Sequence, residues 1–322
     1  MKKKFRVFVT SRIPEAGLQI LASKCELDIF ADEKLTRTQF IRHLQDKDGL
    51  LCLLSNPVDS EIIDSAPRLK VISNYAVGYN NIDIQAATRR GIVVTNTPGV
   101  LTDATADLAW ALLLAVSRRI VEGDRMMRRG DYRGWEPQLL LGQDLKDKTL
   151  GILGAGRIGS AVARRSVGWN MQVLYFDRKR NPDLEEKVNA RFTPLNQLFA
   201  YSDFISIHLP LTAETNHLVD EKALRRMKST ACLVNTARGP IVDEAALVRA
   251  LKEGWIAGAA LDVFENEPEI HPELKSLNNA VLTPHIGSAT VGTRNAMAEI
   301  AAENLLAVLA GGKPRFPVNH IG

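Results

Sequence analysis

Three side chains of complementary chemistry follow three short apolar runs in the second half of the chain. Arg238 lies in Val-Asn-Thr-Ala-Arg-Gly, Glu267 in Asp-Val-Phe-Glu-Asn-Glu-Pro and His285 in Thr-Pro-His-Ile-Gly. An arginine is permanently charged and can bind a carboxylate through two parallel hydrogen bonds. A histidine can protonate a carbonyl oxygen, and a glutamate paired with it favours the imidazolium form. The three residue types therefore suit the reduction of a carbonyl group that stands beside a carboxylate.

Each of these residues also has an ordinary structural interpretation. An arginine after a strand commonly forms a surface salt bridge, and a loop glutamate is commonly solvated. A histidine beside a proline can serve structure alone. The catalytic interpretation depends on all three lying at one edge of one sheet, beside a site for a hydride donor.

A glycine-rich segment in the middle of the chain predicts such a site. Residues 148–159 read Lys-Thr-Leu-Gly-Ile-Leu-Gly-Ala-Gly-Arg-Ile-Gly, so an apolar strand runs into a turn that opens a helix. Gly154 permits the tight turn, Gly156 lets the backbone approach a pyrophosphate, and Gly159 lets helix and strand pack closely. Asp177 ends the next expected strand, where it can accept hydrogen bonds from a ribose 2′-OH. The pattern predicts a dinucleotide site.

The apolar runs also predict the elements that position these residues. Strands are expected at 6–10, 26–30, 49–54, 71–73 and 92–95, separated by short amphipathic helices. A second series begins at Thr149, with six strands expected at 149–153, 172–176, 204–208, 231–235, 259–262 and 281–283. A long helix from about Thr102 to Arg129 lies between the series, and a last helix spans Thr293–Ala310. Apolar strands joined by helices indicate parallel sheets that are covered on both faces.

The order of the two series predicts an α/β fold with two doubly wound parallel-sheet domains. Residues 1–98 and 288–322 would form the substrate domain, and the dinucleotide-binding domain, residues 99–287, would be inserted in it. Two chain crossings would then form a hinge beside a cleft. Ligands of open α/β sheets bind beyond the carboxyl ends of the strands.

Composition narrows the classes of partner. A net charge of +4 over 322 residues gives no case for nucleic acid. The longest apolar stretch, 108–116, is half a membrane span, and the apolar run after the basic start is too short for a signal peptide. The three cysteines are far apart and suit buried thiols in a reducing compartment, and no metal-ligand spacing is present. We expect a cytoplasmic protein with no metal, nucleic-acid or membrane partner.

In this order the motifs resemble the D-isomer-specific 2-hydroxyacid dehydrogenase family over essentially the whole chain. The resemblance is carried by the glycine fingerprint, His-Leu-Pro-Leu-Thr at 208–212, Asn-Thr-Ala-Arg-Gly at 235–239, Leu-Asp-Val-Phe-Glu at 261–265 and Pro-His-Ile-Gly at 284–287. It implies the inserted-domain layout, a homodimer, and Arg238, Glu267 and His285 as the catalytic set.

The resemblance also implies specific ligand contacts. Residues 73–83 are similar to the family's substrate loop, in which the Val77 and Gly78 N–H groups would hold the substrate carboxylate opposite Arg238. Asp262 and the Thr236 carbonyl would hold the cofactor carboxamide. The implied cofactor contacts are Thr102, Gly154, Ala155, Gly156, Arg157, Ile158, Gly159, Asp177, His208, Pro210, Thr236, Ala237, Arg238, Asp262, His285 and Gly287.

Within the family the chain is most similar to glyoxylate and hydroxypyruvate reductases, through Leu54-Ser55, residues 74–83 and Gly-Trp-Glu-Pro at 134–137. In that branch the tryptophan reaches across the dimer, so Trp135 is a candidate for substrate-size selection, or an interface residue alone. The implied reaction reduces a small 2-oxo acid, glyoxylate or hydroxypyruvate, to the D-2-hydroxy acid. Two alternatives stay open: a sister dehydrogenase acting on D-lactate, 3-phosphoglycerate, formate or phosphite, and an NAD(H)-sensing scaffold like the corepressors of this fold.

One position departs from this branch, which often uses NADPH and has a small or basic residue where Asp177 stands. Asp177 would repel a 2′-phosphate, whereas Arg178, Lys179 and Arg180 could attract one. The carboxylate acts at contact distance, and the mobile basic side chains act through more water. We expect NADH to be favoured, with NADPH use possible.

Overall fold

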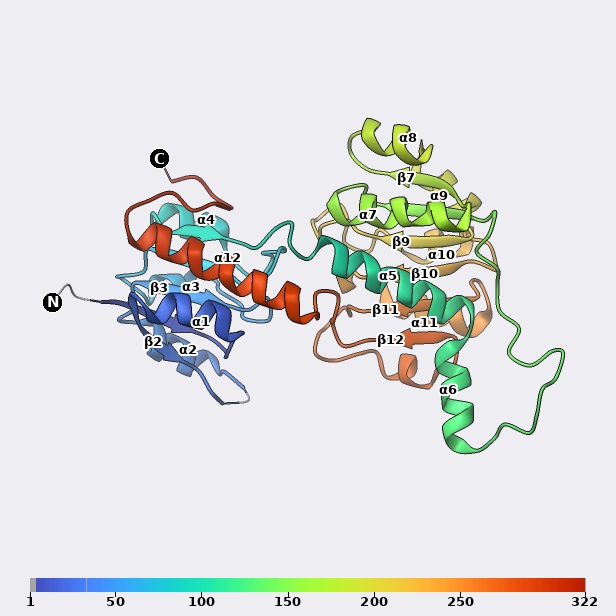
Figure 1. Ribbon diagram of the computed structural model, residues 1–322, viewed down its shortest axis with the longest axis horizontal. Helices are drawn as coiled ribbons and strands as arrows, with labels where there is room; N and C mark the ends of the chain where they lie inside the picture. The colour runs from blue at the N-terminus through green and yellow to red at the C-terminus, as the bar shows by residue number, and fades with distance from the viewer. Residues whose placement is uncertain (1–3, 33, 322) are drawn as a thin grey trace. The chain divides into compact units, whose positions relative to one another are not determined.

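The computed structural model describes residues 4–32 and 34–321. The chain divides into two compact units (Figure 1). The first unit contains the residues up to Leu101 together with those from Ser288 onward, and the second unit contains Thr102–Gly287.

Over its described residues, the first unit holds a five-stranded parallel sheet in the order β2-β1-β3-β4-β5. Its strands are β1 (Phe5–Val9), β2 (Cys25–Ile29), β3 (Gly49–Cys52), β4 (Val71–Asn74) and β5 (Val93–Thr95). Its helices are α1 (Glu15–Ala22), α2 (Arg37–Leu44), α3 (Ser60–Asp64), α4 (Ile84–Arg89) and α12 (Val291–Leu309).

The last helix of the chain is built into this first unit. It packs on α1 so closely that a Cβ atom at Gly17 would lie 2.6 Å from the Ala298 carbonyl oxygen. The buried Ser73 hydroxyl of β4 donates to the Ala301 carbonyl at 2.8 Å. A segment more than two hundred residues away thus covers the sheet formed by the start of the chain.

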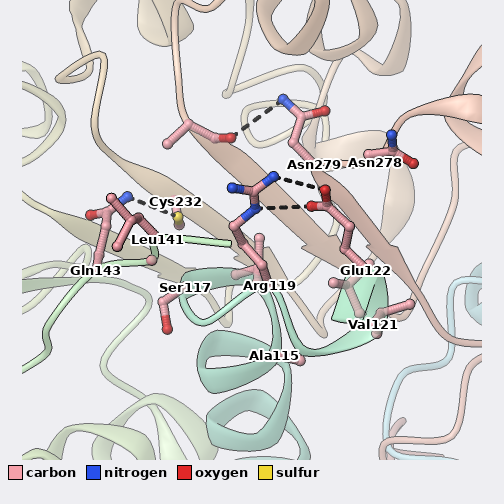
Figure 2. Close-up of a pocket in the computed structure, with 14 residues that line it drawn as sticks. Ala115, Ser117, Arg119, Val121, Glu122, Leu141, Gln143, Cys232, Asn278 and Asn279 are labelled. Carbon is pink, nitrogen blue, oxygen red and sulfur yellow. Dashed lines mark hydrogen bonds and ion pairs between the residues drawn. The ribbon is translucent and has the colours of Figure 1, made fainter. Parts of the chain in front are cut away.

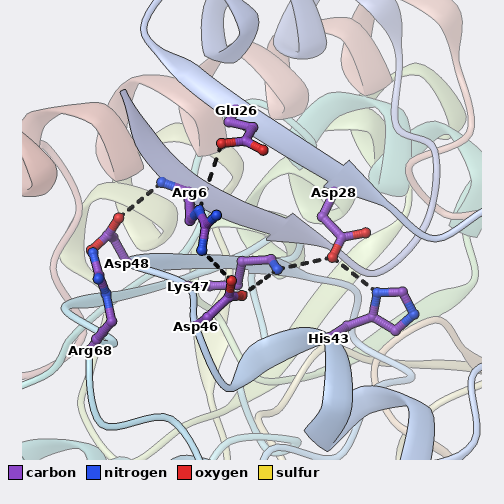
Figure 3. Close-up of polar contacts among 8 residues, drawn as sticks. All are labelled: Arg6, Glu26, Asp28, His43, Asp46, Lys47, Asp48 and Arg68. Carbon is purple, nitrogen blue, oxygen red and sulfur yellow. Dashed lines mark hydrogen bonds and ion pairs between the residues drawn. The ribbon is translucent and has the colours of Figure 1, made fainter. Parts of the chain in front are cut away.

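A network of charged groups surrounds the beginnings of β1 and β3 (Figure 3). His43 belongs to it through a 3.0 Å contact between its Nδ1 and Asp28. Its ring stacks on Phe8, with centroids 5.1 Å apart, and it meets Phe30 edge-on. The polar sequence around His43 indicates a surface residue, but only 25% of this side chain is exposed. His43 lies on α2, whereas Phe8 lies on β1 and Phe30 directly follows β2, so local composition does not predict its burial.

The second unit, all of whose residues the structure describes, has a seven-stranded parallel sheet in the order β12-β11-β10-β9-β6-β7-β8. The chain starts at β6, runs outward through β7 and β8, and then returns to form β9 on the other side of β6. A topological switch point therefore lies between β6 and β9. The strands are β6 (Thr149–Leu153), β7 (Gln172–Phe176), β8 (Arg191–Phe192), β9 (Phe204–Ile207), β10 (Cys232–Asn235), β11 (Gly258–Leu261) and β12 (Ala280–Leu282).

Helices cover both faces of this sheet. One apolar core lies against α5 (Thr102–Ser117) and α7 (Arg157–Arg165), with α8 (Pro182–Val188) beyond them. The other lies against α9 (Leu195–Tyr201), α10 (Glu221–Arg226) and α11 (Glu244–Glu253). The buried strands are consequently apolar on both faces, which makes them visible in the sequence.

Two expectations about this unit are wrong. The sheet has seven strands, because the two exposed residues Arg191 and Phe192 add β8 at its edge. The long helix expected over 102–129 is broken into α5 and α6 (Ile120–Arg129), because Arg119 adopts a left-handed backbone with φ of 51°. All of α6 is described, and none of its residues is buried. The helix and the loop after it project from the body of the second unit (Figure 1).

The three cysteines are free and buried, as expected. Among the helices of residues 4–32 and 34–321, none is both long enough and apolar enough to cross a membrane.

Candidate active site

The turn between β6 and α7 makes different demands on its three glycines. Gly154 has φ of 96°, and a Cβ atom there would lie 2.8 Å from the His208 carbonyl carbon. A Cβ atom at the buried Gly159 would lie 1.9 Å from the Gly154 oxygen. At Gly156, by contrast, no described atom beyond the adjoining residues of the chain lies within 4 Å of the Cβ position. The fold requires Gly154 and Gly159, whereas Gly156 keeps the backbone open to an approaching group.

Asp177 follows β7 directly and faces the same turn. One carboxylate oxygen accepts a hydrogen bond from the Ala155 N–H at 2.8 Å, and the other accepts from the Arg178 N–H at 2.6 Å. An ionised carboxylate has about four acceptor positions, so it can accept further donors from a ligand. Of the basic residues after it, Arg180 is bound to Glu185 at 2.7 Å.

His208 stands at the end of β9, on the other side of the turn. Its Nε2 contacts the Ser206 hydroxyl at 2.8 Å, and burial lowers the pKa of the ring to about 3. The ring is therefore neutral and suits a binding wall better than acid–base chemistry. Its Nδ1 is buried and has no hydrogen-bond partner among the described residues, a position that an ordered ligand or water would satisfy.

Arg238 is positioned by the loop that follows β10. The Asn235 side chain accepts from the Ala237 N–H at 3.0 Å and donates to the Arg238 carbonyl at 2.9 Å. Gly239 packs against Phe264, since a Cβ atom there would lie 1.8 Å from the Phe264 oxygen. Burial lowers the pKa of Arg238, while the charge of Glu267 raises it. An arginine remains charged under both influences, so the site holds a largely buried cation.

Asp262, after β11, fixes the loop that carries His285. Asp262 is 1% exposed, and its carboxylate accepts from the Thr283 hydroxyl and from the N–H groups of Ile286 and Gly287, at 2.7–2.8 Å. Its carbonyl accepts from the His285 N–H at 2.9 Å. The resemblance assigns Asp262 to the cofactor carboxamide, and the contacts present give it an additional role in holding residues 283–287.

Glu267 and His285 are hydrogen-bonded to each other. Glu267 Oε2 lies 2.9 Å from His285 Nδ1, and Oε1 accepts from the Phe264 N–H at 3.0 Å. Burial acts to raise the pKa of Glu267, but His285, the Phe264 N–H and Arg238 together bring it below its ordinary value. Glu267 is consequently ionised at neutral pH and orients the imidazole through Nδ1, so that Nε2 takes no part in this pair.

The second unit thus brings Arg238, Glu267 and His285 within electrostatic reach of one another, at the carboxyl ends of β10, β11 and β12. Thr102 begins α5, whose Thr105 lies 3.3 Å from the Cβ position of Gly287. Such a group of cation, imidazole and carboxylate can bind an anionic substrate and deliver a proton beside it. Sequence reasoning missed the bracing role of Asn235, although its place at the end of a strand in the Arg238 motif is a usable signal.

The other predicted substrate contacts lie elsewhere. Leu54 and Ser55 follow β3, and Val77 and Gly78 follow β4, at the carboxyl edge of the first unit's sheet. The Asn81 side chain joins these two loops by donating to the Leu53 carbonyl at 3.1 Å. Trp135 lies in the loop after α6 and is 81% exposed.

A separate pocket of about 380 Å³ lies at the opposite edge of the second sheet (Figure 2). It is lined by the end of α5, by Leu141, and by residues at the starts of β10 and β12. Because ligands of open α/β sheets bind beyond the carboxyl ends of strands, this pocket is not the candidate active site. In the described part of the chain, no three His, Cys, Asp or Glu side chains are grouped so that they could hold a metal ion.

Comparison with known proteins identifies the family. Residues 110–287 match the model of the D-isomer specific 2-hydroxyacid dehydrogenase, NAD binding domain. The chain belongs to the D-isomer specific 2-hydroxyacid dehydrogenase family. It is therefore an oxidoreductase with a domain that binds a nicotinamide cofactor.

Full-length relatives show the same similarity. A glyoxylate reductase of Pyrococcus horikoshii is 51% identical over 320 residues, which cover 98% of this chain and 96% of that protein. The crystal structure of a glyoxylate reductase from Paecilomyes thermophila has a TM-score of 0.88 and 35% identity, covering 99% of each chain. That of an NADPH-dependent glyoxylate/hydroxypyruvate reductase from Sinorhizobium meliloti, in complex with NADP and malonate, has a TM-score of 0.85 and 34% identity. It covers 98% of this chain and 97% of that one. The two parallel-sheet α/β units expected from the sequence are confirmed as this family's fold.

Proposed function

We propose that this enzyme reduces glyoxylate or hydroxypyruvate to the D-2-hydroxy acid, with NADH favoured and NADPH usable. Full-length relatives that are named glyoxylate reductases support the substrate class. The observation that carries the chemistry is the hydrogen bond between Glu267 and His285 Nδ1, which leaves Nε2 to serve a substrate.

The residues of the second unit fit a dinucleotide. The open approach at Gly156 suits a pyrophosphate at the start of α7, and Asp177 suits a ribose hydroxyl. Two buried polar atoms, His208 Nδ1 and Thr236 Oγ1, have no partner among the described residues and lie in segments assigned to the cofactor. The remaining assigned contacts are Thr102, Ala155, Arg157, Ile158, Gly159, Pro210, Ala237, Asp262 and Gly287. When bound, a reduced nicotinamide supplies the hydride.

The chain's own residues then have distinct tasks. Arg238 binds the substrate carboxylate with its forked N–H groups, which fixes the orientation of the neighbouring carbonyl. His285 Nε2 hydrogen-bonds the carbonyl oxygen and transfers its proton as negative charge develops there. Glu267 stays ionised, holds the ring in place and stabilises the charged imidazolium before the transfer. The N–H groups of Val77 and Gly78 also bind the carboxylate, and Leu54 and Ser55 contact the substrate.

The assembly that we propose is a homodimer. Three groups on and beyond α6 support it, since Met127, Trp135 and Leu141 are respectively 59%, 81% and 65% exposed. Apolar surface of this extent on a projecting segment is typical of a subunit contact. In that dimer Trp135 would contribute to substrate-size selection. The free, buried cysteines support a reducing compartment such as the cytoplasm.

The test is a substrate panel with the purified protein. Glyoxylate, hydroxypyruvate and pyruvate are offered with NADH and NADPH, and D-lactate, 3-phosphoglycerate, formate and phosphite with the oxidised cofactors, following nicotinamide absorbance. We expect the two proposed substrates to give the highest kcat/KM, and His285→Ala to lower it roughly 10²–10⁴-fold. The exposed His320 offers a matched control, and His320→Ala should keep wild-type kinetics. Binding of NADH without reduction of any 2-oxo acid would favour a sensing scaffold instead.

A further inference from the structure

The loop after β4 has three consecutive carbonyl groups that are each held by a donor of the same unit. The Ala76 carbonyl accepts from the Thr97 N–H at 2.9 Å. The Val77 carbonyl accepts from Asn96 Nδ2 at 2.7 Å, and the Gly78 carbonyl accepts from Asn74 Nδ2 at 2.8 Å. The donors come from the ends of β4 and β5, so the sheet edge itself fixes the loop.

These bonds determine where the loop directs its N–H groups. In a planar trans peptide the carbonyl and the N–H point in opposite directions. The peptide whose carbonyl belongs to Val77 carries the N–H of Gly78, so the Asn96 bond turns that N–H away from Asn96. The Thr97 bond sets the Val77 N–H in the same manner. Within the described residues, neither N–H has an acceptor, and both residues are partly exposed.

Asn96 is itself firmly held. Its N–H donates to the Phe316 carbonyl at 3.3 Å, and its carbonyl accepts from the Asn304 side chain at 3.2 Å. Asn304 is 1% exposed on α12, and its own oxygen accepts from the N–H groups of Arg315 and Phe316. The side-chain amide can face Val77 only through its nitrogen, because an amide oxygen there would oppose the carbonyl oxygen.

We propose that Asn96 is a positioning residue that presents the Gly78 N–H to the substrate carboxylate by holding the Val77 carbonyl. The inference rests on the proposed function, in which the Val77 and Gly78 N–H groups bind that carboxylate. Asn74 acts on the following peptide in the same way. Without the Asn96 donor the Val77–Gly78 peptide can turn, and the substrate loses a charge-assisted hydrogen bond.

The experiment compares Asn96→Ala and Asn96→Asp with Asn319→Ala. Asn319 is also buried beside β5, but its side chain bonds Val94, Ile92 and Thr88 instead of the 75–81 loop. KM and kcat are measured with glyoxylate. Dissociation constants are measured for NADH and for oxamate, an analogue of the substrate that the enzyme cannot reduce. Thermal melting reports the structural cost of each substitution.

We expect Asn96→Ala to raise KM and the oxamate dissociation constant roughly ten- to a hundredfold, with NADH affinity unchanged. Asn319→Ala should lower the melting temperature and keep the wild-type KM. In Asn96→Asp an ionised carboxylate faces the Val77 carbonyl, so KM should rise at neutral pH. At acid pH the protonated carboxyl again offers a donor, so the KM of Asn96→Asp should fall toward the wild-type value. This fall should be steeper than any change of the wild-type KM over the same pH range.

Two results would overturn the inference while leaving the proposed function intact. One is an active wild type together with a wild-type KM in both Asn96 variants. The other is an Asn96→Ala variant whose glyoxylate and NADH affinities fall in parallel with its stability, which marks a structural role. If Asn96→Ala does not fold, the pH dependence of Asn96→Asp decides. A wild type that reduces no 2-oxo acid refutes the proposed function itself.

Discussion

The β6–α7 turn allows cofactor binding and folding to be separated by two Gly→Ala substitutions only three residues apart. Gly156 is exposed and has an extended backbone (φ −73°, ψ −158°) that alanine readily adopts. Beyond the adjoining residues of the chain, no described atom lies within 4 Å of its Cβ position. We expect Gly156→Ala to change the free energy of unfolding by no more than about 1 kcal/mol. The added methyl group would occupy the space assigned to the pyrophosphate.

The methyl group added at position 156 should therefore weaken the complex with NADH and leave the free protein almost unaffected. Inserting a methyl group into a close contact costs about 1–3 kcal/mol, so the dissociation constant for NADH should rise roughly 5- to 150-fold. Gly159→Ala should instead act on the stability of the fold. Its Cβ atom would lie 1.9 Å from the Gly154 oxygen, so helix and turn must separate by more than about 1 Å and the free energy of unfolding should fall by about 3 kcal/mol or more.

The assay combines urea unfolding without cofactor with NADH titration by fluorescence. Gly168→Ala is the control, since this glycine is exposed and no described atom outside its own helical turn lies within 4 Å of its Cβ position. It should alter neither quantity appreciably. Wild-type NADH affinity in Gly156→Ala would show that the pyrophosphate does not lie on this turn. Unchanged stability in Gly159→Ala would refute the packing argument.

Three further outcomes follow from single side chains. The charge of Glu267 is present at neutral pH and is lost only as pH falls through its lowered pKa, so Glu267→Gln removes it where the wild type has it. Because Glu267 and His285 are partly exposed, their 2.9 Å contact is worth about 1.4 kcal/mol. In the variant the alkaline limb of the kcat/KM profile should therefore move about one unit to lower pH. An unmoved limb would exclude the coupling between Glu267 and His285. Asp177→Asn keeps an acceptor for Ala155 but removes the charge, so the ratio of kcat/KM with NADPH to that with NADH should rise about tenfold; an unchanged ratio would locate cofactor choice elsewhere. If the exposed ring of Trp135 anchors the subunit contact, Trp135→Ala should weaken self-association, measured by sedimentation, by about 2 kcal/mol or more. An unaltered dimer would show that Trp135 is not an anchor of the contact.

The elements that the sequence predicts well are those whose signal is local. β6 and β7 have the bounds expected from their apolar runs, because a strand covered on both faces must be apolar throughout. β8 carries no such signal, since its two residues are exposed at an edge. The sequence also carries no signal for the break before α6. Arg118 and Arg119 are good helix formers, and the helix ends only because Arg119 adopts a left-handed φ.

The candidate site divides in the same way. Residue types and their places after strands predict Arg238, Glu267 and His285, and the glycine spacing predicts the turn. Side-chain contacts between distant segments were not predictable. Asn235 bracing the Arg238 loop is within reach of a sequence argument, but Asn96 holding Val77 depends on the register of β4 and β5. Asp262 shows how far the sequence argument reaches. Its motif suggests a contact with a ligand, whereas its hydrogen bonds in the structure hold residues 283–287 in place.

The backbone of His285 gives a physical reason for that brace. His285 has φ of 53°, in the left-handed region that costs a residue with a side chain roughly 1 kcal/mol or more. Glycine would adopt this conformation without cost, but it has no imidazole. The conformation persists because Asp262 holds the N–H groups on and after the strained residue: its carbonyl binds that of His285, and its carboxylate binds those of Ile286 and Gly287. A buried carboxylate with three donors is therefore used to keep a ring in an unfavourable backbone position, and Glu267 then fixes the ring itself. Such strain is retained where the direction of a side chain matters more than local stability, which is the condition that proton transfer to one carbonyl oxygen imposes.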